Sequence, residues 1–202
     1  MAEMKHCERP IRILLGGGIG SGKSIAMRRF EDLGAMPVEA DRLGHAVLEP
    51  DGEAFGAVSE RWPSVVVGGR IDRGALAEIV FACPSQLSEL EKITHPAIVH
   101  RVSEFASSAE DLVVEIPLIL GVPGAWTRVF VGANPDVRLR RAIERGSSEA
   151  DVQRRMDNQA GRDEWMMWCD KTIDNNGSLE DLEKQIDSLW SELRSTDDGL
   201  RL

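Results

Sequence analysis

The chain has 202 residues, of which 42% are hydrophobic and 29% charged, so it can bury a core and remain soluble. This balance excludes collagen-like, disordered and disulfide-scaffold proteins. Its 24 Lys and Arg residues face 34 Asp and Glu residues, and the resulting net charge of −10 argues against a nucleic-acid partner, whose phosphates a protein must neutralise.

The cysteines and the apolar runs bear on the compartment. Cys7, Cys83 and Cys169 lie far apart and form no CxxC pair, which favours neither a disulfide framework nor a zinc site and fits a reducing compartment. The apolar run at 11–15 is interrupted by Arg12 and is too short for a signal-peptide core, and no run could span a bilayer. We expect a cytoplasmic protein with no membrane partner.

A phosphate loop is the first strong motif in the chain. The run at 11–15 predicts a strand and 24–33 predicts a helix, and between them lies GGIGSGKS at 17–24, which satisfies GxxxxGK[ST]. The glycines let backbone N–H groups turn inward around an anion, at the positive end of a helix dipole. Lys23 supplies a charge for the β- and γ-phosphates and Ser24 a hydroxyl for Mg²⁺. The motif predicts nucleotide binding; the alternative is a glycine-rich turn that serves packing alone.

An acidic residue follows the second predicted strand, 36–40. Asp41 lies where a carboxylate could accept the proton of an attacking hydroxyl, as the general base of phosphoryl transfer. Asp before a helical run also commonly caps the helix. Spacing leaves both roles open.

The segment 44–111 is longer than a single crossover helix requires. Within it, 75–81 and 85–106 read as helices, with Pro84 suited to a helix start. We predict a helical lobe at the carboxyl edge of the sheet, where doubly wound proteins bind ligands. His95-Pro96 interrupts the second helical pattern, and residue type alone favours a structural role for His95 over a ligand role.

A third strand is predicted at 112–116 and a fourth at 128–132. Glu115, at the end of the third strand, is a candidate to hold the water shell of a metal ion. The alternative is a solvated carboxylate at a strand end.

Seven arginines crowd residues 134–162, where helices are predicted at 135–145 and 148–160 around a break at 146–148. A helix, a hinge and an arginine-rich return describe a lid that closes on a triphosphate and stabilises the transition state. We name 146–162 the lid segment. Arg145 and Arg155 are interpreted as functional, whereas a solvated basic face paired with local acids is preferred for three others: Arg138, Arg140 and Arg154.

The chain ends in a predicted strand at 171–174, a helix at 179–193 and a frayed tail at 195–202. Trp165 and Trp168, with Met166 and Met167, are interpreted as packing residues. The alternation of strands and helices predicts an α/β fold with a parallel sheet flanked by helices.

In this order the motifs resemble the dephospho-CoA kinase family, over nearly the whole chain from Ile11 to about Trp190. The phosphate loop is shared by many nucleotide-binding proteins, but the ordered set is far more specific. The matching segments are GGIGSGKS (17–24), EADRLGHAVLEP (39–50), GRIDRGALAEIVF (69–81), ITHP (93–96), EIPLI (115–119), RLRRAIERG (138–146), RRMDNQ (154–159) and IDNNGSLEDL (173–182).

The resemblance implies phosphorylation of the ribose 3′-hydroxyl of dephospho-CoA by MgATP, the last step of CoA biosynthesis. It implies a P-loop kinase core at 11–43 and 112–194, a helical acceptor lobe at 44–111 and the lid. Lys23, Asp41 and Arg145 would be catalytic, and Ser24 would bind Mg²⁺, with Glu115 acting through water. The remaining site residues would contact either ATP (Gly18, Ile19, Gly20, Ser21, Gly22, Ile25, Arg155, Asn175 and Gly177) or the acceptor (His95, Pro117 and Leu118).

Several positions depart from the family pattern. Gly16 and Ile25 stand where the family usually has Thr, and three more positions, Glu39, Glu115 and Gly132, stand where Asp is usual. A P-loop kinase with another acceptor and a nucleotide-binding module without turnover are therefore kept as alternatives. Asp41 and the lid arginines argue against the module, because binding alone does not need them. We expect a monomer or a weak oligomer.

Overall fold

The computed structural model describes residues 9–195, which fall into two compact units. Of the described residues, unit 1 contains 9–38, 108–119 and 124–195, and unit 2 contains 39–107 and 120–123. Each unit is described by itself below.

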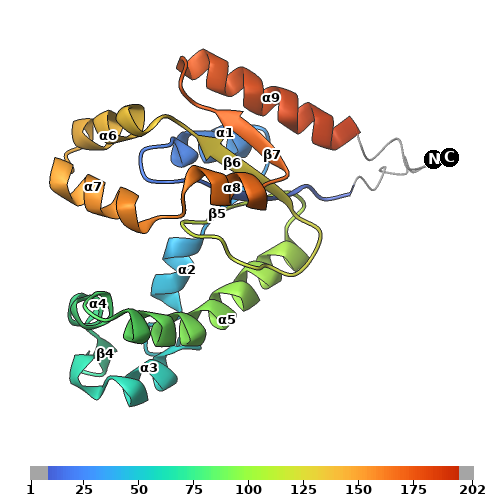
Figure 1. Ribbon diagram of the computed structural model, residues 1–202. Coiled ribbons are helices and arrows are strands. Elements are labelled where there is room, and N and C mark those ends of the chain that lie inside the picture. Colours follow the sequence, from blue (N-terminus) through green and yellow to red (C-terminus); the bar gives the residue numbers. More distant parts are fainter. Residues whose placement is uncertain (1–8, 196–202) are drawn as a thin grey trace, which may run out of the picture. The chain divides into compact units, whose positions relative to one another are not determined.

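Unit 1 is built on a five-stranded sheet in the order β2-β5-β1-β6-β7, of which β5, β6 and β7 are labelled in Figure 1. β1 pairs in parallel with β5 and with β6, and β6 pairs in parallel with β7. The central strands are almost wholly buried, which explains their continuous apolar runs. All five predicted strands are confirmed to within one residue at each end: β1 (Arg12–Gly16), β2 (Met36–Glu39), β5 (Leu112–Glu115), β6 (Thr127–Gly132) and β7 (Lys171–Asp174).

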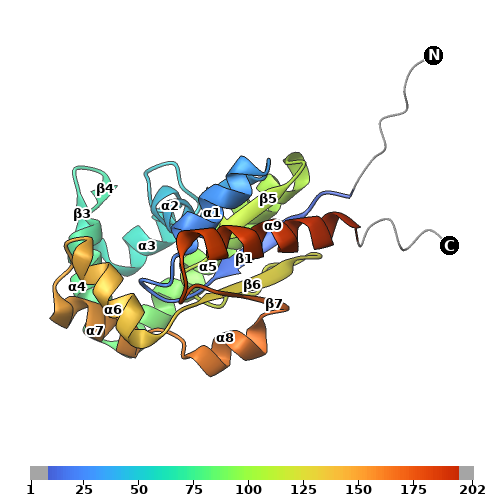
Figure 2. The ribbon, with the colours of Figure 1, turned by 90° about the horizontal axis from the view of Figure 1, so that it is seen from above.

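Helices cover both faces of this sheet. Figure 2 shows α1 (Lys23–Asp32) beside α9 (Leu179–Ser195) on one face and α8 (Arg162–Trp168) on the other, where α8 packs on β6. The Phe30 and Trp190 rings meet between α1 and α9 at a centroid distance of 6.1 Å. On the same helices Arg29 donates two hydrogen bonds of 2.7 Å to Asp187, and its guanidinium lowers the pKa of that carboxyl.

A glycine hinge separates the two arginine-bearing helices of unit 1. α6 (Pro135–Glu144) ends before Gly146, which has a φ of +94°, and α7 (Glu149–Asn158) begins after Ser148. The Ser148 side chain caps α7 by accepting a hydrogen bond from the Asp151 N–H. The predicted break at 146–148 is thus confirmed, and its cause is a left-handed glycine followed by a serine cap.

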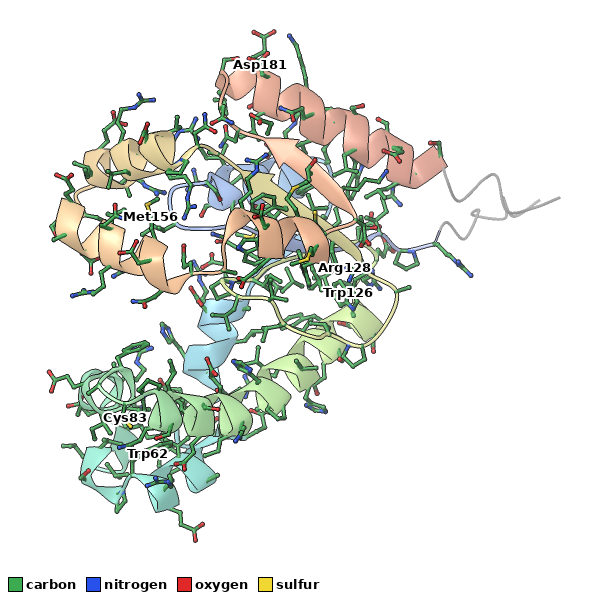
Figure 3. The ribbon with its side chains drawn as sticks, in the orientation of Figure 1. Trp62, Cys83, Trp126, Arg128, Met156 and Asp181 are labelled. Carbon is green, nitrogen blue, oxygen red and sulfur yellow. The ribbon has the colours of Figure 1, made fainter. Side chains whose placement is uncertain are left out.

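Unit 2 is mainly helical, with α2 (Ala40–Ala46), α3 (Phe55–Arg61), a 3₁₀ turn (Pro63–Val65), a short hairpin of β3 (Val66–Val67) and β4 (Arg70–Ile71), α4 (Arg73–Phe81) and α5 (Pro84–Ser108). The two helices predicted in this segment are confirmed as α4 and α5. Trp62, labelled with Cys83 in Figure 3, donates a 2.7 Å hydrogen bond from its indole N–H to Gln86 and so joins the end of α3 to α5.

α5 begins at Pro84, as predicted, but the expected interruption at His95-Pro96 is wrong. The helix continues through Pro96, which is exposed, although a proline inside a helix cannot donate the usual backbone hydrogen bond.

The remaining sequence expectations concern the Trp and Met packing residues, the C-terminal tail and membrane-spanning segments. Packing is confirmed for Trp165, which is 2% exposed, and it is wrong for Met167, which is 82% exposed. α9 extends to Ser195, while the rest of the predicted tail, like Cys7, lies outside the described residues. Within residues 9–195 no helix combines the length and the apolar character needed to cross a membrane.

Candidate active site

The phosphate loop connects β1 to α1 and has the backbone of an anion cradle. Gly17, Gly20 and Gly22 take φ angles of +149°, +76° and +100°, which side-chain-bearing residues rarely adopt. Gly22 occupies the cap position of α1, so the helix begins at Lys23 with its first N–H groups facing the loop. The predicted order of strand, loop and helix is confirmed.

A cavity of about 260 Å³ opens beside this loop within unit 1. Its walls come from the loop, the first turn of α1 and the last turn of α6, and the lining residues are Gly18, Gly20, Gly22, Lys23, Ser24, Ile25, Arg141, Glu144 and Arg145. Three backbone positions, two cationic side chains from α6 and Lys23 therefore face one space, which suits a polyanion.

Lys23, Ser24 and Glu115 form a cluster at the carboxyl ends of β1 and β5. Lys23 Nζ lies 3.6 Å from Glu115 Oε1, and the Ser24 hydroxyl donates to Glu115 Oε2 at 3.5 Å. The Lys23 and Glu115 side chains are only 12% and 20% exposed. The alternative of a solvated strand-end carboxylate at Glu115 is thus wrong, because this carboxylate is held against the loop.

Arg141 lies in the last turn of α6, and Arg145, four residues further on, is the C-cap residue that follows the helix. Arg141 donates to the Asn175 carbonyl oxygen at 2.9 Å, which fixes its guanidinium beside the loop. Arg145 is exposed and donates to the Arg141 carbonyl oxygen at 3.2 Å. Sequence reasoning singled out Arg145 but missed Arg141, although the spacing of four residues was a usable signal. It also missed Glu144, which no pattern in the sequence distinguishes from the other acidic residues.

Asn175 is an anchor of the loop. Its side chain is 3% exposed and donates to the Ser21 carbonyl oxygen at 2.7 Å. Ser21 is itself 1% exposed, and neither Ser21 nor Ile19 lines the cavity. Gly177 lies two residues further on, in the exposed connection between β7 and α9.

The other arginines assigned in the stretch 134–162 differ in what they contact. The solvated interpretation holds for Arg140 and Arg154, which are exposed and pair with Glu144 and Asp151. For Arg138 it is wrong: this half-buried side chain donates to the Ile19 carbonyl oxygen at 2.8 Å, and burial lowers its pKa. Arg155 is exposed, pairs with Asp151 at 2.9 Å and does not line the cavity.

The predicted acceptor residues lie on different elements. Asp41, in unit 2, is exposed and is the second residue of α2. The N-cap of that helix is Glu39, so the capping interpretation of Asp41 is wrong. His95 is half-buried on α5 of unit 2, beside the buried Thr94. Pro117 and Leu118 follow β5 in unit 1, and Leu118 is 42% exposed.

No group of three or more His, Cys, Asp or Glu side chains that could hold a metal ion occurs among residues 9–195. The Ser24 hydroxyl and the Glu115 carboxylate are nevertheless both oxygen donors, 3.5 Å apart at the cavity. Mg²⁺ characteristically takes one or two such protein ligands and completes its shell with water and substrate phosphates. The donor set therefore fits Mg²⁺ arriving with a nucleotide.

The comparisons with known proteins agree on one family. A family model described as dephospho-CoA kinase matches residues 11–181. The dephospho-CoA kinase of Syntrophotalea carbinolica is 37% identical, with 89% of this chain and 90% of that protein covered. That of Corynebacterium jeikeium is 36% identical, with 91% and 100% covered.

Solved structures resemble the fold as well. The crystal structure of TT1252 from Thermus thermophilus superposes with a TM-score of 0.78 at 34% identity, covering 92% of this chain and 98% of that one. Dephospho-CoA kinase from Campylobacter jejuni gives a TM-score of 0.66 at 23% identity over 92% and 98%.

Proposed function

Since the chain belongs to the dephospho-CoA kinase family, we propose how its own residues bind the two substrates and transfer the phosphoryl group. The chain is an ATP-dependent kinase of dephospho-CoA and acts in CoA biosynthesis. The acceptor atom is the ribose 3′-hydroxyl, and the products are CoA and ADP.

The cluster of Lys23, Ser24 and Glu115 beside the phosphate loop carries the proposal. Loop N–H groups at Gly18, Gly20 and Gly22 surround the phosphates, together with those of Lys23, Ser24 and Ile25. Before ATP binds, Glu115 balances the Lys23 charge at 3.6 Å. With ATP present, Lys23 turns to the β- and γ-phosphates, where it offsets negative charge that builds up during transfer.

Ser24 would be the direct Mg²⁺ ligand, and Glu115 would hold the ion through water. When bound with ATP, Mg²⁺ neutralises charge on the β- and γ-phosphates. The donors that support this role are the Ser24 hydroxyl and the Glu115 carboxylate, 3.5 Å apart.

Arg145 serves the transferring phosphate, and the lid segment covers it. Arg145 lines the cavity, and the Gly146 hinge that follows it gives the segment freedom to close. Arg155, which is exposed and pairs with Asp151, reaches ATP only after such closure. Asn175 and Gly177 border the adenine, in the connection that also anchors Arg141.

Asp41 is the general base and accepts the proton of the 3′-hydroxyl. It is an exposed carboxylate that caps no helix, and it lies two residues after the end of β2, a strand of the same sheet as β1. The lobe at 44–111 binds dephospho-CoA through His95, with Pro117 and Leu118 contributing from the segment after β5. The reaction takes place in the cytoplasm, on a monomer or weak oligomer.

The test is to incubate the protein with MgATP and dephospho-CoA and to follow both by liquid chromatography and mass spectrometry. We expect a product heavier by one phosphoryl group that co-elutes with authentic CoA, and equimolar ADP. A phosphorylated product that separates from CoA would contradict the 3′ assignment. ATP consumption with other small alcohols but not with dephospho-CoA would contradict the choice of acceptor.

A further inference from the structure

Ile19, in the middle of the phosphate loop, is held by side chains from outside the loop. Its N–H donates to Gln159 Oε1 at 2.8 Å, and its carbonyl oxygen accepts from Arg138 Nε at 2.8 Å. Arg138 also donates from Nη2 to the same Gln159 oxygen at 3.3 Å. Both polar backbone groups of one loop residue are thus satisfied by two side chains that also bond to each other. We name Ile19, Arg138 and Gln159 the loop clamp.

The loop glycines leave the space that the clamp fills. A Cβ at Gly18 would stand 2.6 Å from Arg138 Cζ and 3.0 Å from Gln159 Oε1. A Cβ at Gly20 would stand 2.8 Å from the Arg138 Cα, which is backbone and cannot swing away. Gly20 is therefore needed for the close approach of the α6 backbone, and Gly18 leaves room for the two clamp side chains.

No charged partner among residues 9–195 explains the position of Arg138. Among the described residues no carboxylate forms an ion pair with it, although the side chain is half-buried and burial lowers its pKa. A buried cation is costly unless hydrogen bonds compensate it, and those bonds go to Ile19 and Gln159. The hydrogen bonds of this guanidinium thus go to the phosphate loop and to Gln159.

Gln159 gives the clamp a second connection. It is the C-cap residue that follows α7, inside the lid segment, whereas Arg138 belongs to the first turn of α6. The clamp therefore bonds the middle of the loop to the carboxyl-terminal end of the lid segment, and the Gly146 hinge lies at the opposite end of α7. Met156, labelled in Figure 3, marks the last turn of α7.

We propose that Arg138 and Gln159 act together as positioning residues that fasten the phosphate loop at Ile19 to the end of the lid segment and hold the loop in its ATP-binding shape. The inference rests on the proposed function, because it assumes that ATP occupies this loop. Without the clamp, part of the free energy of ATP binding would be used to order the loop, so the affinity for ATP would fall. Loss of the clamp would therefore raise the Kd for ATP. It would leave kcat nearly unchanged, because the residues that act in phosphoryl transfer are still present.

The test compares three variants, Gln159→Met, Arg138→Met and the double variant, with two matched controls. Gln153→Met on α7 and Arg140→Met on α6 are the controls, because both side chains are exposed and bond only within their own helix. The Kd for ATP is measured calorimetrically without dephospho-CoA, and amide hydrogen exchange is followed at Ile19.

We expect each single clamp variant to raise the Kd for ATP about tenfold, since a backbone group loses its partner. The double variant is expected to resemble the weaker-binding single variant, because both residues act on one backbone unit. Ile19 N–H exchange should accelerate in Gln159→Met. The kcat at saturating ATP and the KM for dephospho-CoA should change less than about threefold, and the controls should match the wild type.

Unchanged ATP affinity in a folded Gln159→Met variant would overturn the proposal, and so would strictly additive losses in the double variant. If Gln159→Met fails to fold, Arg138→Met alone decides by the same measurements. Failure of both to fold would make the clamp a purely structural contact and would also overturn it. Because dephospho-CoA is absent, the result does not depend on the acceptor; a wild type that does not bind ATP would instead refute the proposed function.

Discussion

Gly16→Ala adds one methyl group at a position where the protein has left no room for it. A Cβ there would stand 2.8 Å from Trp165 Cε3, 2.9 Å from Cη2 and closer still to Cζ3. Ordinary contact between carbon atoms is about 3.5–4.0 Å, so the indole must move by roughly an ångström. The resemblance to the dephospho-CoA kinase family led to an expectation of Thr at this position, and the Trp165 ring fills the space that such a side chain would take.

The ring cannot move freely. Trp165 is 2% exposed, stacks on Phe130 with a centroid distance of 5.9 Å and meets the edge of Trp168 at 5.2 Å. Overpacking a core typically costs 1–3 kcal/mol, and we expect about 3 kcal/mol here because the obstacle is a rigid ring with rings behind it. For a chain of this size that lowers the Tm by roughly 6–12 °C.

The assay is urea and thermal unfolding of Gly16→Ala, Trp165→Leu and the double variant. Trp165→Leu destabilises by leaving a cavity, but the alanine should then fit, so that adding Gly16→Ala to Trp165→Leu costs less than about 1 kcal/mol. Gly121→Ala is the control, because a Cβ there meets nothing within 4 Å. A Gly16→Ala variant as stable as the wild type, or equal losses with and without Trp165, would refute this packing argument.

Asp41→Asn removes the proposed general base without removing a helix cap, so kcat should fall by about 10²–10⁴ while Tm and the Kd for ATP stay unchanged. A variant with wild-type kcat would show that another residue is the base. Arg145→Gln should lower kcat more than it raises the Kd for ATP, with Arg140→Gln as the inert control; an effect on Kd alone would assign Arg145 to ground-state binding. Arg29 lowers the pKa of the Asp187 carboxyl, so this pair stabilises the fold above the unfolded-state pKa of about 3.9 and stops doing so as the pH falls through the folded value. At about pH 7 the wild type should have a higher Tm than Asp187→Asn, and at about pH 2 the two Tm values should be equal. A Tm difference that does not change with pH would contradict the pairing.

The central strands of the sheet could be predicted from the sequence because they are largely buried on both faces. Residues 112–116 and 128–132 stand out as apolar runs for that reason, and β5 and β6 occupy them. The β3–β4 hairpin escaped prediction because each strand has only two residues and no periodicity can be seen over that length.

The site was only partly predictable, because spacing along a helix does not reveal what the helix packs against. Lys23 and Ser24 follow from a motif whose geometry is local. Arg138 and Arg140 are indistinguishable in the sequence, yet one bonds to the loop and the other lies in solvent, because only Arg138 meets the space left by Gly18. The contact of Glu115 with Lys23 depends on the pairing of β1 with β5, which no local pattern encodes.

Quantifying CoA formed by wild type and by Lys23→Ala, under identical MgATP and dephospho-CoA, tests most directly the claim that this loop performs the reaction. The wild type should convert dephospho-CoA to CoA, and Lys23→Ala should lose at least about a hundredfold in rate, the scale of one electrostatic contact to a transition state. Circular dichroism of both proteins should be the same, since the Lys23 ammonium lies at the cavity, where it meets Glu115 and the Gly18 carbonyl oxygen rather than the buried core. Equal rates in the two proteins, or a folded wild type that forms no CoA, would contradict the account.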